Sequence, residues 1–394
     1  MDRRRFLQWT RLAGLAAGVN SVLAAPLKAG PPKREPAAGP QVSPKIAPPE
    51  SASPETLLLK DYQPRSIYKI PVTQIPKATY PVIDMHSHPY AKTPQEVDAW
   101  VRTMDQVGIE KTIILTMTRG AEFREISTKY AGHPERFEMW CGLDLAGIGS
   151  AAVSLKELAR CHDAGARGVG EIHDKGEGLR SGKSTAPGIH PDDPRMDELW
   201  EKCAELGMPV SLHVADPIWM YQKMDRHNDG LMNAYEWRLD NKPGIVGLSG
   251  MIDILERTLA RHRNTTFIAC HFANLDYDLG RLGQVLERNP NLYADIAARY
   301  AETAPIPRFA TKFYEKYAGR LVYGTDMGMD PEMYRITFRI LESLDEHFYE
   351  IEQFGYHWSL NGFGLSDAIL KQVYHDNAAR LLAGRVHASR GGAS

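Results

Sequence analysis

The run Val82-Ile83-Asp84-Met85-His86-Ser87-His88 begins apolar and ends in two histidines that stand two positions apart. On an extended segment the side chains alternate between two faces, so residues two apart point to the same side. The imidazoles of His86 and His88 can therefore hold one divalent cation. Such a run is typical of a buried strand that emerges into a functional site.

Short apolar runs of this kind alternate with longer amphipathic stretches from about Tyr62 onward. The strand candidates are Val82–His88, Thr112–Thr116, Phe137–Asp144, Gly168–His173, Pro209–Val214, Thr266–Phe272, Leu292–Ile296 and Leu321–Thr325. The helical candidates between them include Pro94–Val107, Ser154–Ala164, Met196–Leu206, Met251–His262 and Leu279–Arg288. This alternation predicts an α/β fold, a (β/α)8 TIM barrel. A doubly wound open sheet is the alternative, but no Gly-x-Gly-x-x-Gly follows the first strand.

The ends of these strands carry a series of residues that can bind metals. In a parallel barrel, catalytic groups lie at the C-terminal ends of the strands. Read in order, those ends give His86, His88, Glu171, His173, His213, His271 and Asp326. A single strand histidine is more often a satisfied core residue, but burying this whole set without a cation would cost too much. The joint pattern therefore predicts a metal site, because His, Asp and Glu are ligands of borderline divalent cations.

The composition excludes some classes of partner. The formal net charge is −2, and no basic block interrupts the chain. This argues against binding to nucleic acid or to an anionic membrane surface. A hydrophobic content of 43% and a mean hydropathy of −0.38 indicate a soluble globular protein. The four cysteines show no paired spacing and are expected to be buried apolar side chains rather than disulfides or metal thiolates: Cys141, Cys161, Cys203 and Cys270.

The first sixty residues are not expected to belong to the barrel. The segment Asp2–Gln8 contains three arginines followed by Phe-Leu and resembles a twin-arginine export signal. The Ala- and Gly-rich stretch after it is too short and too weakly apolar for a transmembrane helix. We therefore expect a signal peptide over 1–25, a Pro-rich linker over 26–60 and the catalytic barrel over 61–388. We also expect export to the periplasm by the twin-arginine machinery, with no stable membrane anchor. The alternative is a cytoplasmic protein that begins with a basic segment.

From Val82 to Leu382 the sequence resembles the amidohydrolase superfamily. Within it, the chain is similar to the amidohydrolase-related branch that contains aminocarboxymuconate-semialdehyde decarboxylase and lactone and amide hydrolases. The residues that carry the resemblance are Asp84–His88, Gly132–Phe137, Leu212-His213, Cys270-His271, Tyr323-Gly324-Thr325-Asp326 and Asp376–Leu382. The resemblance implies a barrel with a metal centre and a single catalytic domain, with an insertion after strand five.

The expected metal centre holds one divalent cation on His86, His88, His213 and Asp326. Zinc is the expected metal, with manganese, iron or cobalt as options. Relatives with two metals often carry a lysine near the end of strand four, where this chain has Glu171. A carboxylated lysine cannot bridge two metals at that position. Two roles remain open for Glu171 and His173, which could bind a second metal or support the other ligands.

Hydrolysis of a small cyclic amide, lactone or ester is the expected reaction. A bound cation would activate water, Asp326 would accept its proton, and His271 would orient the substrate carbonyl and stabilise the oxyanion. The first alternative is non-oxidative decarboxylation of an aromatic or unsaturated acid, in which Asp326 and His271 manage proton transfer to carbon. The second is a non-catalytic exported binding protein, which predicts missing ligands. The expected partner is a small-molecule substrate, and a homo-oligomer is left open.

The substrate pocket is less clearly marked. A long insertion after His213 carries Trp219 and Tyr221, which are candidates to line an apolar or cyclic substrate or to pack the insertion itself. Arg299, after strand seven, is a candidate clamp for a substrate carboxylate, with an ordinary ion pair as the alternative. Asp225–Gly230 with Glu236 matches several positions of a calcium-binding EF-hand loop. Its third position is histidine, so a polar turn is the expected structure.

Overall fold

The computed structural model describes residues 53–148 and 151–383. The chain divides into two compact units, Met1–Tyr62 and Gln63–Ser394. The first unit contains the short 3-10 helix η1, Leu59–Asp61. The expected signal peptide and most of the expected linker lie outside the described residues, so export stays a prediction. No helix within the described ranges combines the length and apolar character needed to cross a membrane.

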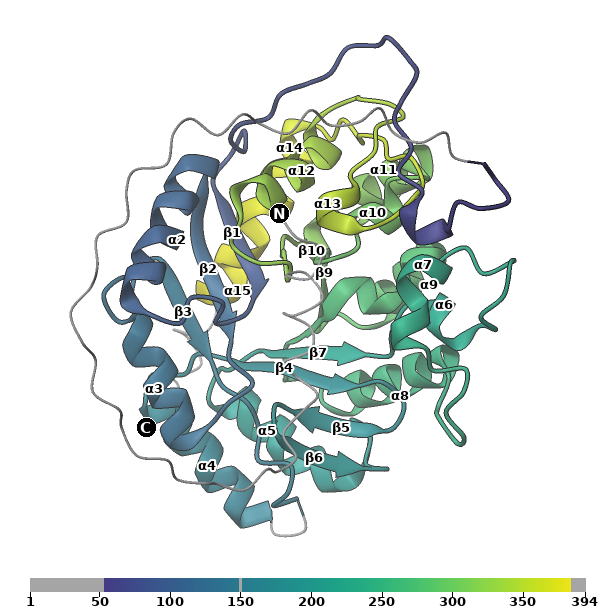
Figure 1. The fold of residues 1–394 in the computed structure, drawn as a ribbon. Helices are drawn as coiled ribbons and strands as arrows, with labels where there is room; N and C mark the ends of the chain where they lie inside the picture. Colours follow the sequence, from purple (N-terminus) through teal and green to yellow (C-terminus); the bar gives the residue numbers. More distant parts are fainter. Residues whose placement is uncertain (1–52, 149–150, 384–394) are drawn as a thin grey trace, which may run out of the picture. The chain divides into compact units, whose positions relative to one another are not determined.

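The second unit contains the predicted (β/α)8 barrel (Figure 1). Its eight strands run parallel to their neighbours and are β1 Val82–Ser87, β2 Ile109–Leu115, β3 Phe137–Trp140, β4 Val169–Asp174, β7 Val210–Val214, β8 Phe267–Ala269, β9 Leu292–Asp295 and β10 Leu321–Val322. They form a three-stranded sheet, β1-β2-β3, and a larger sheet in the order β10-β9-β8-β7-β4-β5-β6.

Backbone hydrogen bonds join these two sheets at both seams. Between β3 and β4, the Gly170 amide donates to the Cys141 carbonyl at 2.8 Å. Between the first and last strands, the Met85 amide donates to the Tyr323 carbonyl at 2.9 Å. A Cβ atom at Gly324 would lie 2.7 Å from Cβ of His86, so only glycine allows the last strand to approach the first this closely.

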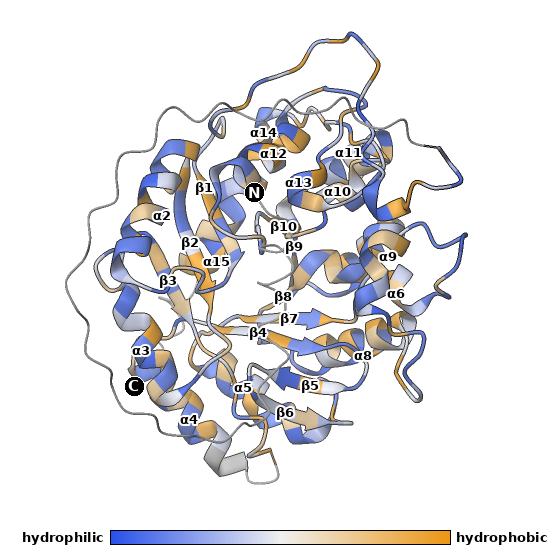
Figure 2. Ribbon diagram, viewed as in Figure 1, coloured by the Kyte–Doolittle hydropathy of each residue, from blue (hydrophilic) through white to orange (hydrophobic). Residues whose placement is uncertain are grey.

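Helices pack around the strands and fill the connections between them. They are α2 Pro94–Val107, α3 Gly120–Tyr130, α4 Ala151–Asp163, α5 Asp197–Glu205, α8 Leu248–Arg261, α9 Leu279–Arg288, α10 Tyr300–Thr303, α11 Pro307–Tyr317, α12 Pro331–Glu342, α13 Ile351–Phe354, α14 Asp367–Lys371 and α15 Asn377–Ala383. Local sequence sets their ends: the Thr93 side chain accepts from the Glu96 amide at the start of α2, and Gly108 ends it with φ 90°. The surrounding helices carry both hydrophilic and hydrophobic residues (Figure 2), as expected for helices with one face on the barrel.

Several features differ from the expected strand pattern. The strands expected over Phe137–Asp144 and Leu321–Thr325 end earlier, at Trp140 and Val322. A hairpin of β5 Gly178–Ser181 and β6 Ser184–Pro187 follows β4. β5 pairs antiparallel with β4, and neither hairpin strand is one of the eight barrel strands. The strand expected over Thr266–Phe272 ends at Ala269, because Cys270–Asn274 form a tight turn, η4. The expected insertion after strand five folds into α6 Ile218–Tyr221, α7 Leu231–Ala234 and η3 Tyr235–Trp237.

Candidate metal centre

The seven residues predicted from the strand ends lie together at the carboxyl ends of the barrel strands. They come from β1 and the residue after it, β4, β7, the turn after β8 and the loop after β10: His86, His88, Glu171, His173, His213, His271 and Asp326. His86, Glu171, His213 and His271 are buried, whereas His88, His173 and Asp326 retain partial exposure.

Glu171 is the central acid of the group. One carboxylate oxygen, Oε1, accepts from Nδ1 of His213 at 2.7 Å and lies 3.5 Å from Nε2 of His271. The other, Oε2, lies 2.9 Å from His173 Nε2, 3.4 Å from His88 Nε2 and 3.6 Å from His86 Nε2. Burial alone would raise the pKa of Glu171, but the surrounding imidazoles outweigh it and hold the pKa well below its usual value.

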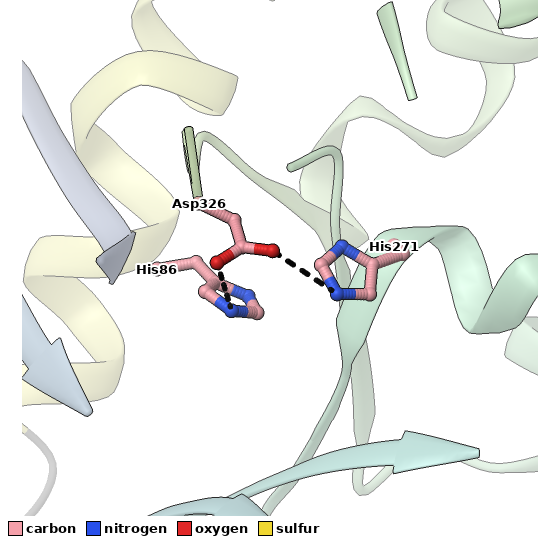
Figure 3. A group of neighbouring side chains, drawn as sticks. All are labelled: His86, His271 and Asp326. Atoms are coloured by element: carbon pink, nitrogen blue, oxygen red, sulfur yellow. Dashed lines mark ion pairs between the residues drawn. The ribbon is translucent and has the colours of Figure 1, made fainter. Parts of the chain in front are cut away.

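Asp326 faces the same space from the last strand. Its Oδ1 lies 3.0 Å from Nε2 of His88. Figure 3 shows its contacts with two further imidazoles: Oδ1 lies 3.6 Å from Nε2 of His86, and Oδ2 lies 3.7 Å from Nε2 of His271. Burial opposes ionisation, but the neighbouring histidines lower the pKa of Asp326. Its backbone is left-handed, with φ 57°, and is held by a hydrogen bond of 2.8 Å from its amide to the His86 carbonyl.

His86 offers the clearest test of whether a cation fits. Its Nδ1 hydrogen-bonds Oδ2 of Asp295 at 2.8 Å, and its buried Nε2 has no hydrogen-bond partner in the described part of the chain. That nitrogen lies 3.6 Å from oxygens of both Glu171 and Asp326. Burial opposes a charge on His86, but the carboxylates of Asp295, Asp326 and Glu171 raise its pKa well above the usual value. A positive charge, carried by a proton or by a metal ion, is therefore favoured between this nitrogen and the two carboxylates. The donor set therefore fits a divalent metal.

His88 is oriented in a similar way. Its Nδ1 lies 2.8 Å from the Leu115 carbonyl, which can only accept, so Nε2 points into the centre. Burial would lower the pKa of His88, but hydrogen bonds to Asp326 and Glu171 raise it to about 9. The two carboxylates thus favour positive charge at this ring, and a divalent cation bound to His88 would supply that charge instead.

His213 lies between two carboxylates, neither of which is Asp326. Its Nδ1 bonds Glu171, and its Nε2 lies 3.1 Å from Oδ1 of Asp216. The same Asp216 oxygen lies 3.0 Å from Nζ of Lys175. The closest groups of candidate ligands are His86 with His88 and Glu171, His86 with His271 and Asp326, Glu171 with His173 and His213, and His86 with Cys270 and Asp295. The expected set of His86, His88, His213 and Asp326 is therefore divided among these groups, and its role as a ligand set stays a prediction.

His271 sits on an unusual backbone. It begins a run of four left-handed residues, His271–Asn274, with φ between 54° and 58°. Such conformations are costly for residues other than glycine and cluster at functional sites. The turn is supported by a hydrogen bond of 2.8 Å from the His271 amide to Asp295 and by bonds from the Asn274 side chain to the carbonyls of Val214 and Ala215. Burial lowers the pKa of His271, so its ring is neutral at pH 7.

The three candidate substrate residues are engaged with other parts of the protein. Nη2 of Arg299 donates to Oδ1 of Asn274, and its guanidinium forms ion pairs with Asp276 at 3.5 Å and Glu302 at 3.6 Å. The Tyr221 hydroxyl accepts from the Asp216 amide at 3.2 Å. These contacts favour structural roles for both residues, and substrate binding by them stays a prediction.

Trp219 packs the insertion against the loop after α13. Its ring centroid lies 5.7 Å from that of Trp358 and 6.2 Å from that of Tyr356. On the insertion side, a Cβ atom at Gly230 would lie 2.4 Å from the indole. The ring thus packs against both the insertion and the loop after α13, and substrate binding by Trp219 stays a prediction.

The loop Asp225–Gly230 has the features of a polar turn. The His227 amide donates to Oδ1 of Asp225 at 2.9 Å, and the Asn228 amide group donates to the Trp219 carbonyl at 3.0 Å. None of the candidate metal groups found among residues 53–148 and 151–383 includes this loop. Calcium binding there is untested.

Two acids of the site were not among the predicted residues. Asp295 ends β9 and contacts both His86 and the His271 backbone, and Asp216 contacts His213. Asp295 had a signal in the sequence, since it is an acid within the apolar run Leu292–Ile296, at a strand end like the other predicted ligands.

A parallel α/β barrel with histidines and carboxylates at its carboxyl ends defines a class of metal-dependent barrel proteins. The family model described as amidohydrolase matches residues 77–384. The chain belongs to the amidohydrolase family, which confirms the resemblance seen in the sequence. Its members typically use a divalent metal, and candidate ligands for one are present in this chain.

The chain is similar to several solved structures, and the one with a TM-score above 0.5 supports the fold. An uncharacterized TIM-barrel protein from Bordetella bronchiseptica is 18% identical, with a TM-score of 0.51 over 77% of this chain and 99% of that one. A 2,6-dihydroxybenzoate decarboxylase from Rhizobium is 16% identical, with a TM-score of 0.49 over the same shares. A D-hydantoinase from Thermus sp. is 15% identical, with a TM-score of 0.42 over 76% of this chain and 70% of that one. Among curated protein sequences, none matches this chain.

Proposed function

We propose that the chain is a metal-dependent hydrolase that acts on a small cyclic amide, lactone or ester. The observation that carries the proposal is the buried, unpartnered Nε2 of His86, which faces the carboxylates of Glu171 and Asp326. We place one divalent cation, zinc first, among His86, His88 and Asp326, with His213 as the predicted fourth ligand. A cation bound there would supply Lewis acidity and lower the pKa of water.

Asp326 is suited to move a proton because its two oxygens face different groups. Oδ1 faces His86 and His88, and Oδ2 faces His271. The carboxylate is ionised, since its pKa is lowered by those histidines. It can therefore accept a proton on one oxygen while the imidazole of His271 stands beside the other.

His271 has a defined tautomer in its neutral form. Its Nδ1 lies 2.9 Å from the Ala297 carbonyl, which can only accept, so the ring proton resides on Nδ1. Nε2 then faces the site as an acceptor. His271 must first take up a proton before it can stabilise a developing oxyanion, which makes it a proton acceptor early in the reaction and a donor later.

The choice of hydrolysis over decarboxylation rests on analogy with the superfamily. Decarboxylation of an aromatic or unsaturated acid would use the same residues, so we treat it as an outcome of the test. The export route and the periplasmic location remain part of the proposal and are independent of the chemistry.

The first experiment measures metal content and activity together. The purified protein reconstituted with zinc should hold about one equivalent and turn over at least one member of a panel of lactones, cyclic amides and esters. D326N and H271N should each reduce kcat by about 10²–10⁴-fold. D330N is the matched control, because Asp330 caps α12 outside the centre and its loss should leave kcat unchanged.

Two results would overturn the proposal. Protein that binds no metal after reconstitution would exclude metal-dependent chemistry at this centre. Carbon dioxide release from an aromatic carboxylic acid, without turnover of any lactone, amide or ester, would replace hydrolysis by decarboxylation.

A further inference from the structure

We propose that Asp295 is the positioning residue of this centre, and that one carboxylate sets both the metal-binding tautomer of His86 and the backbone of His271. The inference rests on the proposed function in one respect, namely that His86 binds the metal through Nε2. Neither the family match nor the sequence pattern assigns Asp295 a role.

The geometry of Asp295 divides its two oxygens between two functional residues. Oδ2 lies 2.8 Å from Nδ1 of His86. Oδ1 accepts from the amide of His271 at 2.8 Å and from the amide of Ala297 at 3.0 Å. The residue is fully buried at the end of β9, so water does not compete for these bonds.

Oδ1 of Asp295 accepts from two backbone amides, and Oδ2, the other carboxylate oxygen, is placed to accept from Nδ1 of His86. The proton of a neutral His86 is therefore held on Nδ1, and the lone pair on Nε2 is left for the metal. On the other oxygen, the bond from the His271 amide supports the left-handed conformation at φ 58°. The proposed metal ligand, His86, and the proposed catalytic histidine, His271, are thus both held by the carboxylate of Asp295.

Replacement of Asp295 by asparagine separates these two functions. The amide oxygen of the new side chain can still accept from His271 and Ala297. Its NH2 group then faces Nδ1 of His86, which must become an acceptor, and the ring proton moves to Nε2, where it blocks the metal. Replacement by alanine removes both supports.

The chain provides a matched control in Asp174, at the end of β4. Oδ1 of Asp174 accepts from the amides of Gly176 and Gly178 at 2.9 and 3.1 Å, and Oδ2 lies 2.6 Å from Nδ1 of His190. Its bonding pattern and burial match those of Asp295, but its histidine partner does not belong to the metal centre. A purely structural role predicts equal effects of D295N and D174N on metal binding.

The test compares Co2+ dissociation constants of the full-length wild type, D295N, D295A and D174N by competition with a chromophoric chelator. We expect binding weakened about 10–100-fold in D295N and D295A and unchanged in D174N. At saturating metal, kcat should be lower in D295A than in D295N, because only D295N keeps the support of His271. Equal affinity of D295N and D174N would overturn the inference alone. Failure of the wild type to bind Co2+ would overturn the proposed function and the inference with it.

A second measurement keeps the inference open to refutation if D295N does not fold. In zinc-loaded wild type labelled with 15N-histidine, the His86 ring should carry its proton on Nδ1, with H86N used to assign the signal. A His86 ring protonated on Nε2 in that sample would contradict the role of Asp295.

Discussion

Oε1 of Glu171 lies 2.7 Å from Nδ1 of His213 and accepts its hydrogen bond. Through its second oxygen, the same carboxylate lies within 3.6 Å of His86, His88 and His173. It thus supplies negative charge to a group made mainly of imidazoles. Loss of this charge leaves the histidines without their shared partner, while the size of the side chain is kept in glutamine.

We therefore expect E171Q to bind zinc about 10–100-fold more weakly than the wild type and to lose activity at limiting zinc. Isothermal titration calorimetry with zinc measures the affinity, and initial rates at several zinc concentrations measure the loss of activity. E205Q, at an exposed position of α5, is the control and should match the wild type. If E171Q binds zinc as tightly as the wild type, Glu171 does not contribute to metal binding.

The zinc content of an H173A variant distinguishes one bound metal ion from two. Its Nε2 lies 2.9 Å from Oε2 of Glu171, and it forms a group with Glu171 and His213 that could hold a second cation. With one metal, H173A should retain about one equivalent of zinc by elemental analysis, like the wild type and like H190A, whose histidine lies outside the centre. A wild type with two equivalents and an H173A variant with one would instead show a second metal at this group.

The contact between Trp219 and Gly230 predicts that substitutions at these two positions have strongly coupled effects on the free energy of unfolding. G230A should destabilise the protein by about 1–3 kcal/mol, because the added Cβ meets the indole and the site is already filled. W219A should cost about 2–3 kcal/mol, below the range for a fully buried tryptophan because the ring is half-buried. In the double variant the alanine at 230 should cost nothing further.

Urea unfolding of the two single variants and the double variant measures this coupling. G132A is the control for the glycine change, since nothing lies within 4 Å of a Cβ at that position. Additive free energies of unfolding would show that the insertion does not pack as described.

Glu302 predicts a pH dependence of stability. It shares the Arg299 guanidinium with Asp276 and accepts a hydrogen bond of 2.7 Å from the Tyr356 hydroxyl. Burial raises the pKa of Glu302 from 4.5 to about 7. Between these two values the folded state binds more protons than the unfolded state, so the free energy of unfolding falls as pH rises through this window and levels off above it.

The loss attributable to Glu302 should amount to about 1–3 kcal/mol between pH 4.5 and 7.5. E302Q should remove it, since glutamine does not ionise and its carbonyl still accepts from Tyr356. Denaturant unfolding across this pH range measures the slope for the wild type, E302Q and the exposed control E315Q. An unchanged slope in E302Q would assign the effect to another group.

Much of the fold was predictable because the sequence patterns that mark its strands and helices are local. Apolar runs and amphipathic periods mark strands and helices, and the eight runs expected from the sequence correspond to the eight barrel strands. The end of β8 was placed too late. Cys270-His271-Phe272 is apolar enough for a strand. Tertiary hydrogen bonds, from the His271 amide to Asp295 and from the Asn274 side chain to the Val214 carbonyl, hold a left-handed turn that no local pattern encodes.

The sequence predicted that seven residues of the candidate site lie together, but it missed Asp295 and Asp216. Strand ends brought His86, His88, His213, His271 and Asp326 together because parallel barrels gather those ends at one face. The pairing within the group was not predictable. Whether His213 faces Asp326 or Asp216 depends on side-chain rotamers and on Lys175, which are set by packing rather than by spacing. The same holds for Arg299, whose partners come from separate segments.

The seam between the first and last strands has a consequence for how the protein is made. Oδ1 of Asp84 on β1 accepts from the Thr325 amide at 3.0 Å, and the Asp326 amide donates to the His86 carbonyl at 2.8 Å. His86, on β1, and His88, just after it, emerge from the ribosome some 240 residues before Asp326. The nascent chain therefore cannot bring these two histidines together with Asp326 until synthesis has passed that residue.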